Sequence, residues 1–332
     1  MAFVILHEQT ATQRYDGKQK ARMHLAYRRA SEVHGINTLV FCKPTDIDPA
    51  GVDGAELIKV SYIDGLTGAK RRKLGIEGEP LNVVRSTETI EMDAFNSTFS
   101  IDRRQIKSAN EGAAVIADNM NDATLSVCQA LMQNLFKGKK GANLNWNGLD
   151  YYFETGNALS GMDVKTVLKL SGGVTDQGTA IKFGDHLRKT INGMGVNRPN
   201  FVYTTMDGLS AIQTYNQITL TGVKYVKVGD EEYDSVLGVA VCALPDEYFD
   251  SAVLAKGIPF YFVRNVKDKT GLAIVTKDGT IFDPVVPDLS KGEGRVHTGS
   301  NEIVCAPVPC TVECAARCIV DTSVAVAADT KG

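Results

Sequence analysis

Apolar residues recur at helical spacing over one long stretch of the chain. They step by three or four positions and would therefore lie on one face of a helix. The members of this stripe are Ile106, Ala109, Ala113, Ile116, Met120, Ala123, Val127, Leu131 and Leu135. Asp102 and Gln105 fit a capping box at the start, and Lys137 with Gly138 fits the end. The pattern predicts one helix over residues 103–137, about 52 Å long, lying across a sheet.

Two runs of strand-forming residues precede this helix and predict a long β-hairpin over residues 56–101. The runs are LIKVSYI, from Leu57, and VVRSTETI, from Val83, and a glycine-rich segment separates them. Both runs carry polar residues on both faces, so the hairpin has no core of its own. Because a two-stranded ribbon of this kind is marginal alone, it needs another surface to lie on. This is the first indication of assembly.

The remaining segments predict a mixed α+β fold. Residues 1–54 are expected to form an arm, with a basic amphipathic helix over residues 13–29 and a turn-rich connector after it. From residue 175 onward, helical patterns alternate with strand-like runs such as FVYTT, IPFYFV and GLAIVT. This alternation indicates a central sheet covered by helices, and the block from residue 295 predicts further strands.

The only Trp of the chain stands in NLNWNGLDYYF, residues 143–153, directly after the predicted helix. Gly138 and Gly141 allow positive φ, and the Asn-Gly pair at 147–148 is a strong signal for a tight turn. We expect the Trp and the apolar residues that follow it to pin this corner by packing. A structural corner is thus favoured over a ligand site. Its predicted residues are Gly138, Trp146, Asn147, Gly148 and Leu149.

Composition and charge narrow the class of protein. The 332 residues are 43% hydrophobic and 23% charged, with a formal net charge of −3. Such values are typical of a soluble globular protein and do not predict a nucleic-acid binder. No stretch approaches the roughly 18 apolar residues of a membrane span, and no signal peptide is evident. We expect no membrane partner, and mostly reduced thiols for the seven cysteines.

Motifs for catalysis or cofactor binding are not present in the sequence. FKGKKGAN lacks the spacing of a P-loop, and no helical pattern follows GIEGEP as a dinucleotide fingerprint would require. None of the five histidines lies at metal-ligand spacing from another His or Cys. We therefore expect no enzyme activity, no cofactor and no metal.

Four cysteines lie close together in CAPVPCTVECAARC, near the C-terminus: Cys305, Cys310, Cys314 and Cys318. Their spacing does not match a zinc knuckle. On one strand, the last three would form a stripe on a single face. Three interpretations stay open at this point. Packing of free thiols in a core is favoured, ahead of disulfides, including disulfides between subunits, and of a zinc site.

The tip of the predicted hairpin is strongly charged. It carries the basic run Lys70, Arg71, Arg72 and Lys73, followed by the acids Glu77 and Glu79. A basic run can contact nucleic acid, but aromatic residues are not interleaved with it and the chain is acidic overall. We favour a solvated loop or a loop that contacts another subunit.

The order of these elements resembles the major capsid protein of tailed bacteriophages, which has the Hong Kong 97-type fold. An arm, a long hairpin, a very long helix and an Asn/Gly-rich turn with Gly148 and Leu149 precede a mixed α+β remainder. The run TDQGTAIKFGDHLRKTINGMG, FVYTT, MDGLSAIQTYNQI also looks like that family. VLGVAV before CALPD resembles a family strand, with Ala240 standing where Pro is frequent.

The resemblance implies a domain layout. Residues 1–54 would form the N-terminal arm and 55–101 the extended loop, or E-loop. Residues 102–195 would form the peripheral domain, with the spine helix at 103–137. Residues 196–294 would form the axial domain, and 295–332 would hold strands returning to the peripheral domain and a tail.

The resemblance also implies a function. The chain would assemble with itself into hexamers and pentamers of an icosahedral shell around double-stranded DNA, bound without sequence specificity. Portal and scaffolding proteins would be further partners, and the protein would be found in the virion and, during assembly, in the host cytoplasm. Two alternatives remain open: the shell protein of an encapsulin-like nanocompartment, and an α+β cytoplasmic enzyme with an unrecognised site.

Overall fold

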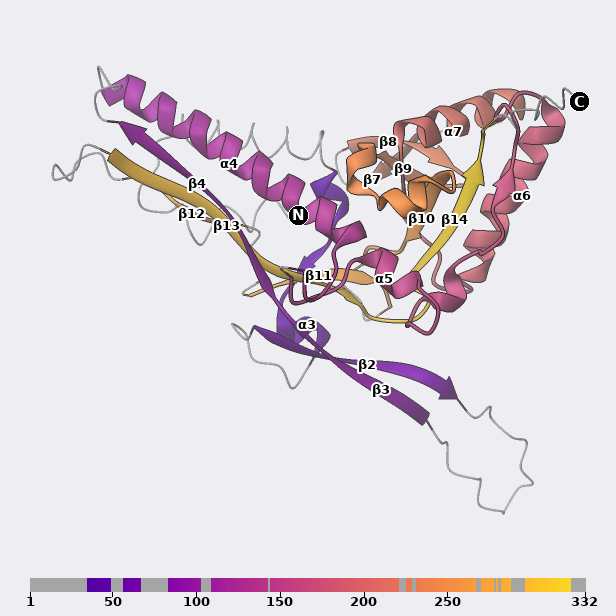
Figure 1. Ribbon diagram of the computed structural model, residues 1–332, viewed down its shortest axis with the longest axis horizontal. Coiled ribbons are helices and arrows are strands. Elements are labelled where there is room, and N and C mark those ends of the chain that lie inside the picture. The colour runs from indigo at the N-terminus through magenta and orange to yellow at the C-terminus, as the bar shows by residue number, and fades with distance from the viewer. Residues whose placement is uncertain are drawn as a thin grey trace, which may run out of the picture.

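The long helix α4, Ala109–Lys137, runs along one side of an elongated part of the molecule (Figure 1). The computed structural model describes residues 35–48, 56–66, 83–102, 109–142, 144–220, 225–228, 231–266, 270–277, 279, 282–287 and 296–323 of the 332-residue chain. The predicted stripe is buried from Ile116 to Leu135, which confirms the helix over its described part. The predicted first turn at 103–108 lies outside the described residues, and Asp102 ends a strand.

The described residues form three sheets. The first is five-stranded, with β1 (Phe41–Cys42), β4 (Asp93–Asp102), β11 (Leu272–Thr276), β12 (Asp283–Val285) and β13 (Val296–Pro309). The second is seven-stranded, in the order β5 (Leu168–Lys169), β14 (Ala315–Asp321), β10 (Ile258–Val263), β6 (Phe201–Thr204), β9 (Val239–Ala243), β8 (Glu231–Val236), β7 (Tyr225–Val228). The third pairs β2 (Leu57–Leu66) with β3 (Val83–Glu91).

Helices cover the two larger sheets. The remaining described helices are η1 (Ile36–Thr38), α3 (Pro44–Ile47), α5 (Leu149–Phe153), η3 (Ser160–Met162), α6 (Gln177–Gly193), α7 (Met206–Ile218), η4 (Asp246–Tyr248) and α8 (Ser251–Leu254). Asp176 caps α6, with its carboxylate accepting from the amide of Thr179 at 2.8 Å. Thr205 caps α7 in the same way. Such caps satisfy amides that the first helical turn leaves without partners.

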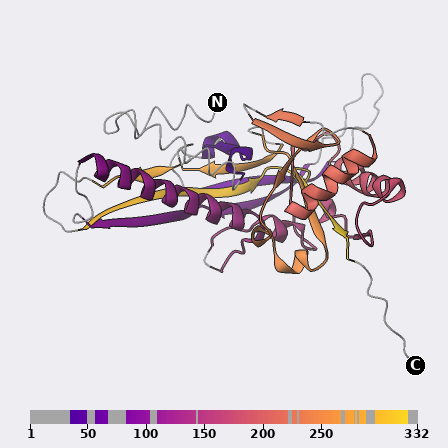
Figure 2. The same ribbon diagram turned by 90° about the horizontal axis from the view of Figure 1, so that it is seen from above.

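Strand β4 belongs to the five-stranded sheet and not to the hairpin, which corrects the predicted hairpin over 56–101. β4 pairs antiparallel with β13, from Val296 opposite Asp102 to Cys305 opposite Asp93. α4 runs along these two strands (Figure 2). The side chains of β4 alternate in exposure, so that one face meets the helix. Local strand propensity predicted the strand correctly but not its partner, because pairing is decided by distant segments.

The predicted domain boundaries also divide the chain differently from the sheets. The block 102–195 includes α6, yet α6 packs against β14 of the seven-stranded sheet. The block 196–294 includes β11 and β12, which belong to the five-stranded sheet. The block 295–332 contributes β13 to one sheet and β14 to the other. The chain therefore crosses between the two sheets several times, and contiguous sequence blocks cannot describe them.

The hairpin is confirmed as a two-stranded antiparallel ribbon, with Leu57 opposite Glu91 and a register shift between Ile63 and Gly65. Its charged tip, residues 67–82, lies outside the described residues. The expectation that the ribbon has no core was wrong at its base. Ile58, Val60 and Ile90 are buried there, in a cluster with side chains of the five-stranded sheet. The base is thus anchored, while the strands lead away from α4 (Figure 1).

Candidate functional site

Two glycines let the chain double back at the C-terminal end of α4. The amide of Gly148 donates to the carbonyl oxygen of Gly138 at 2.8 Å. A Cβ on Gly148 would lie 2.6 Å from the carbonyl oxygens of both Asn134 and Phe136, and one on Gly138 would lie 2.5 Å from that of Asn134. The helix backbone and the returning backbone therefore touch directly, and no side chain fits between them.

The predicted reason for these glycines was only partly correct. Gly141 has the expected positive φ of 87°, whereas Gly138 has none and Gly148 lies at −76° as the N-cap of α5. Asn147 does not form a tight turn with Gly148; its Oδ1 accepts from the amide of Lys140 at 2.8 Å. Close approach of two backbones, and not a left-handed conformation, requires glycine at 138 and 148.

Trp146 and Leu149 anchor this corner in two different clusters of buried side chains. Trp146 is 1% exposed and meets Phe95 of β4 edge to face, with ring centroids 6.0 Å apart. It lies in the cluster that also holds the hairpin base. Leu149 is equally buried but packs with side chains of α4 and of the seven-stranded sheet. The corner therefore connects the five-stranded sheet, the hairpin base and the seven-stranded sheet.

A buried ion cluster lies next to the corner. Arg317 of β14 donates from Nη1 to Oδ1 of Asp150, in α5, at 2.8 Å. Its Nε and Nη2 each donate to a carboxylate oxygen of Asp163 at 3.0 Å. The hydroxyl of Tyr261 donates to Asp150 at 2.6 Å, and the guanidinium stacks over the ring of Phe153 at 4.9 Å. This network joins α5 to strands β10 and β14.

Arg317 stabilises its two carboxylate partners unequally. Burial raises the pKa of Asp150, and the hydrogen bond from Tyr261 and the charge of Arg317 oppose that shift without reversing it. Burial alone would lower the pKa of Arg317, but its partners, chiefly Asp163, hold that pKa above its ordinary value. The bidentate pair with Asp163 takes most of the cation's directed donors, so Asp150 is the less stabilised carboxylate. The oxygen Oδ2 of Asp150 has no hydrogen-bond partner among the described residues.

Only one local pattern in the sequence points to this cluster. Arg317 is the only charged residue inside the run AARCIV, and a charged residue in an apolar strand is a signal for a buried ion pair. Its partners are distant in sequence, so the pairing itself could not be predicted. The predicted corner residues, by contrast, are brought together by the structure.

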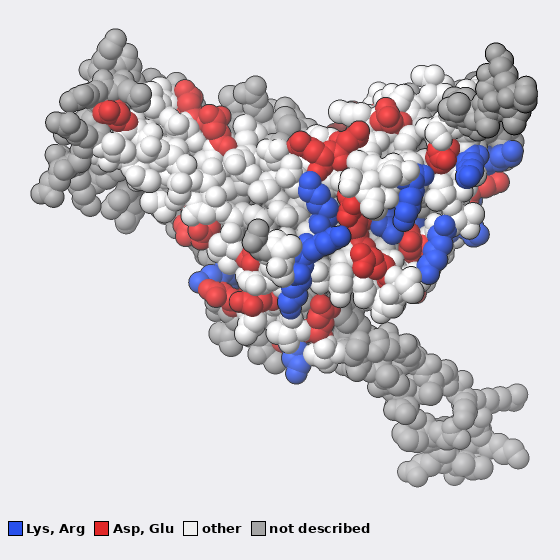
Figure 3. Space-filling model, viewed as in Figure 1, with Lys and Arg blue, Asp and Glu red and all other residues white. Residues whose placement is uncertain are grey.

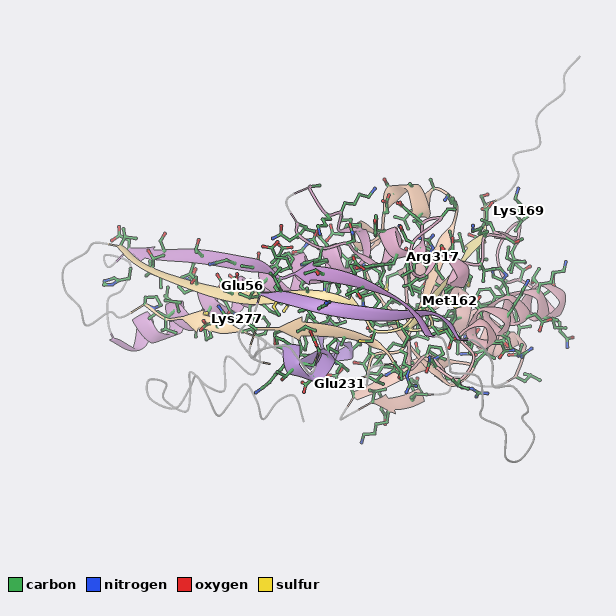
Figure 4. The ribbon with its side chains drawn as sticks, turned by 90° about the horizontal axis from the view of Figure 1, so that it is seen from below. Glu56, Met162, Lys169, Glu231, Lys277 and Arg317 are labelled. Atoms are coloured by element: carbon green, nitrogen blue, oxygen red, sulfur yellow. The ribbon has the colours of Figure 1, made fainter. Side chains whose placement is uncertain are left out.

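The hairpin base is tied to the five-stranded sheet beside this site. The amide of Met92 donates to the carbonyl oxygen of Glu56 at 2.8 Å, across the start of β2 and the end of β3. The carboxylate of Glu56 lies 3.5 Å from Nζ of Lys277, just after β11, where Figure 4 shows the two side chains close together. Because this pair is exposed, burial of Ile58, Val60 and Ile90 is the main anchor.

Comparison with known proteins rests on structure alone, since no protein-family model and no curated protein matches this sequence. A structure from Mycobacterium phage Bobi aligns with a TM-score of 0.53 at 9% identity, over 88% of this chain and 91% of that one. A structure from Mycobacterium phage Adephagia aligns with a TM-score of 0.51 at 11% identity, over 86% and 88%. The holo-SrpI encapsulin complex of Synechococcus elongatus PCC 7942 aligns at 0.50 and 10% identity, over 98% and 95%.

These matches cover most of the chain and are to phage major capsid proteins and an encapsulin. The chain has the Hong Kong 97-type capsid fold. At identities near 10% the match establishes the fold and leaves the function to be argued.

Within this capsid fold, the four C-terminal cysteines lie in different parts of the chain's secondary structure. Cys305 lies in β13 and Cys318 in β14, while Cys310 and Cys314 lie in the segment between those strands. All four are buried free thiols, and they are divided among three clusters of apolar side chains. The stripe expected for Cys310, Cys314 and Cys318 is not formed, because of these three only Cys318 lies in a strand.

Two further properties concern the described residues only. No group of three or more His, Cys, Asp and Glu side chains in the described part of the chain is arranged to hold a metal ion. Of the helices that the structure describes, none has the length and apolar character needed to cross a membrane.

Proposed function

We propose that this protein is the major capsid protein of a tailed bacteriophage, the subunit of an icosahedral shell around double-stranded DNA. The observation that carries the proposal is the fold, which phage structures share over nearly nine tenths of the chain. The sequence supports it independently, because arm, hairpin, long helix and corner follow one another in the order typical of that family.

Each part of the fold has a role in this proposal. The hairpin is the extended loop and α4 the spine helix. The five-stranded sheet belongs to the peripheral domain, and the seven-stranded sheet is the axial domain, which packs around five-fold and six-fold centres. Since the base of the ribbon is anchored and its strands lead outward, its tip would lie on a neighbouring subunit. The tip residues that would make this contact are Lys70, Arg71, Arg72, Lys73, Glu77 and Glu79.

The same proposal names the partners. Copies of the chain form the hexamers and pentamers, and a portal and a scaffolding protein take part in assembly. The packaged DNA is held without sequence specificity. The net charge of −3 is in keeping with a shell that encloses DNA without binding it tightly.

A nanocompartment shell is the second candidate. The specific observation in its favour is the match to the SrpI encapsulin, which covers 98% of this chain and 95% of that one. The content of the shell distinguishes the two functions. A phage shell encloses DNA that enters through a portal, whereas a nanocompartment encloses a protein cargo.

Negative-stain electron microscopy with light scattering on the purified chain tests the proposal. Closed shells, tubes or rings of five or six subunits are the expected result. A chain that stays a monomer, even with crowding agents or a candidate scaffold, contradicts it. Particles recovered from the native host then decide between DNA and protein cargo.

A further inference from the structure

Strand β4 has one edge that the described residues leave unpaired. It pairs with β13 over its whole length without a register shift, and with no other strand that the structure describes. Among the described residues, no main-chain hydrogen bond reaches β4 from its other side. A long strand edge of this kind is a template for pairing with another chain.

The sequence of β4 lacks the features that protect an edge strand from such pairing. Between Asp93 and Asp102 it reads AFNSTFSI, with no charged residue, proline or glycine. The side chains on the face that points away from α4 are short, uncharged and exposed: Ala94, Asn96, Thr98 and Ser100. The surface of this elongated part of the molecule is mostly white in Figure 3, the colour of residues other than Lys, Arg, Asp and Glu. An edge without charges or bulges is expected to be covered in the assembled protein.

We propose that β4 of one copy pairs antiparallel with β4 of a second copy, about a two-fold axis at Thr98. This inference rests on the proposed shell function, which brings many copies together, and it names one surface through which they meet. The contact is isologous, since the same residues contribute on both sides. It joins the two five-stranded sheets into one continuous sheet.

Pairing about Thr98 places compatible side chains opposite one another. On the exposed face, Thr98 meets its own copy and Asn96 meets Ser100, so that side chains able to hydrogen-bond lie across from each other. On the α4 face, Phe95 meets Ile101, an aromatic and a β-branched side chain. Pairs of both kinds stabilise sheets. The acids at the two ends of β4 do not meet in this register, so a second copy fits this edge without repulsion.

The long helices also fit this arrangement. α4 contacts both β4 and β13 and runs along them, so it lies over the space between these strands (Figure 2). Neighbouring strands are about 4.8 Å apart, which places the two α4 axes roughly 10 Å apart on the same face of the joined sheet. Helices in contact pack at about 8–10 Å. Pairing of the strands therefore brings the two helices to contact distance.

A single cysteine at the axis tests the pairing on the full-length chain. Opposite residues of antiparallel strands have Cα atoms about 4.5–5.5 Å apart, within the range for a disulfide. Thr98→Cys is therefore expected to give a covalent dimer when the purified protein is treated with diamide, which takes up two hydrogen atoms as two thiols form a disulfide. The native cysteines are all buried, so the wild-type chain should stay monomeric on a non-reducing gel.

Thr298→Cys is the matched control. Thr298 is exposed on the same face of the sheet but one strand away, in β13, where it lies opposite Ser100. In the proposed dimer the two copies of Thr298 are at least three strand spacings apart, about 14 Å. That distance is too long for a disulfide, so this variant is expected to stay monomeric.

Charge substitution at the axis tests the role of the contact in assembly. Thr98→Lys and Thr98→Glu are each expected to lose shell formation, because like charges directly opposite one another destabilise a sheet. An equal mixture of the two variants is expected to assemble, since opposite charges then meet on the axis. Circular dichroism spectra that match wild type would show that each variant is folded, and particle yield is measured by sedimentation and electron microscopy.

The inference is overturned if Thr98→Cys gives no more dimer than Thr298→Cys, if either charge variant assembles like wild type, or if the mixture does not assemble. A different occupant of the edge, either another segment of the chain or another protein, would produce the first of these results. A wild-type chain that forms no particles, together with a Thr98→Cys dimer, would contradict the proposed function and support the pairing of β4.

Discussion

Replacing Arg317 with Met tests whether the buried ion cluster holds the corner to the seven-stranded sheet. The substitution keeps a similar side-chain volume but leaves the carboxylates of Asp150 and Asp163 in the interior without their cation. Removing one partner of a buried ion pair typically costs about 3–5 kcal/mol. We expect the free energy of unfolding to fall by that amount near neutral pH, because two acids depend on the same guanidinium.

The chain contains a matched control in Arg188→Met. Arg188 lies 2.8 Å from Asp185, the same distance as Arg317 from Asp150, but the side chains of this pair are 55% and 64% exposed instead of 8% and 7%. Exposed pairs contribute at most about 1 kcal/mol. Two arginines with the same pair distance are therefore expected to differ several-fold in their effect on stability.

Acidification gives a second signature of the Arg317 cluster. Burial already raises the pKa of Asp150, and loss of Arg317 removes a contribution that lowers it. A carboxyl group whose pKa is raised in the folded state destabilises the fold above that pKa. The penalty disappears as the pH falls toward the unfolded-state value of about 3.9. The difference between Arg317→Met and wild type should therefore shrink between neutral pH and about pH 4.5.

Urea unfolding of the unassembled chain measures both effects, followed by circular dichroism and by fluorescence of the single Trp146. If Arg317→Met does not fold, Arg317→Lys replaces it in the assay. Lys keeps the charge but not the bidentate geometry, so an intermediate loss of the free energy of unfolding is expected. The reasoning fails if Arg317→Met costs no more than Arg188→Met, or if acidification leaves the difference unchanged.

Three further predictions use the same stability assay or simple labelling. Gly148→Ala is expected to cost about 2–3 kcal/mol through overlap with two carbonyl oxygens, whereas Gly161→Ala, with nothing within 4 Å of its Cβ, should change little; equal effects would contradict the close-contact argument. Leu237 has φ +52° and precedes Gly238 in the β8–β9 turn, so Leu237→Asn should stabilise the chain by roughly 0.5–1 kcal/mol, and a lower urea midpoint would be the opposite result. Burial raises the pKa of Cys318 to about 12, so thiol alkylation of the native chain at neutral pH should follow unfolding; rapid labelling of the folded chain would rule this out.

Elements with strong local patterns could be predicted from the sequence. The stripe from Ile116 to Leu135 repeats at helical spacing, and the capping residues of α6 and α7 stand where the helices begin. The corner after α4 was located correctly because a glycine-rich turn and apolar residues follow one another there. In each case the deciding interactions lie within a few residues of one another in the chain.

Interactions between distant segments were beyond sequence patterns. Strand β4 has the alternating exposed and less exposed side chains of a half-buried strand, but its sequence does not indicate that it pairs with β13. Arg317 meets Asp150 and Asp163 across more than 150 positions. The need for glycine at 148 arises from carbonyl groups of a helix that ended eleven residues earlier. The hairpin base was judged polar on both faces because burial of Ile58 and Ile90 depends on that distant sheet.

The crossings between the two large sheets hold the described fold together as one unit. The segment after β10 and the segment between β13 and β14 are joined directly, since the amide of Arg264 donates to the carbonyl oxygen of Cys314 at 2.9 Å. Asn265 donates to the carbonyl oxygen of Thr38 at 2.8 Å and to the hydroxyl of Tyr203 at 2.6 Å.

The corner after α4 packs on both sheets, with Trp146 in a cluster that includes β11 and β13 and Leu149 in one that includes β6 and β10. Relative motion of the two sheets would disturb this packing and the buried hydrogen bonds of Asn265. In the proposed shell, differences between five-fold and six-fold surroundings would therefore be better accommodated where chains meet. The hairpin, whose base is the part anchored among the described residues, is the part of the described fold best suited to adjust.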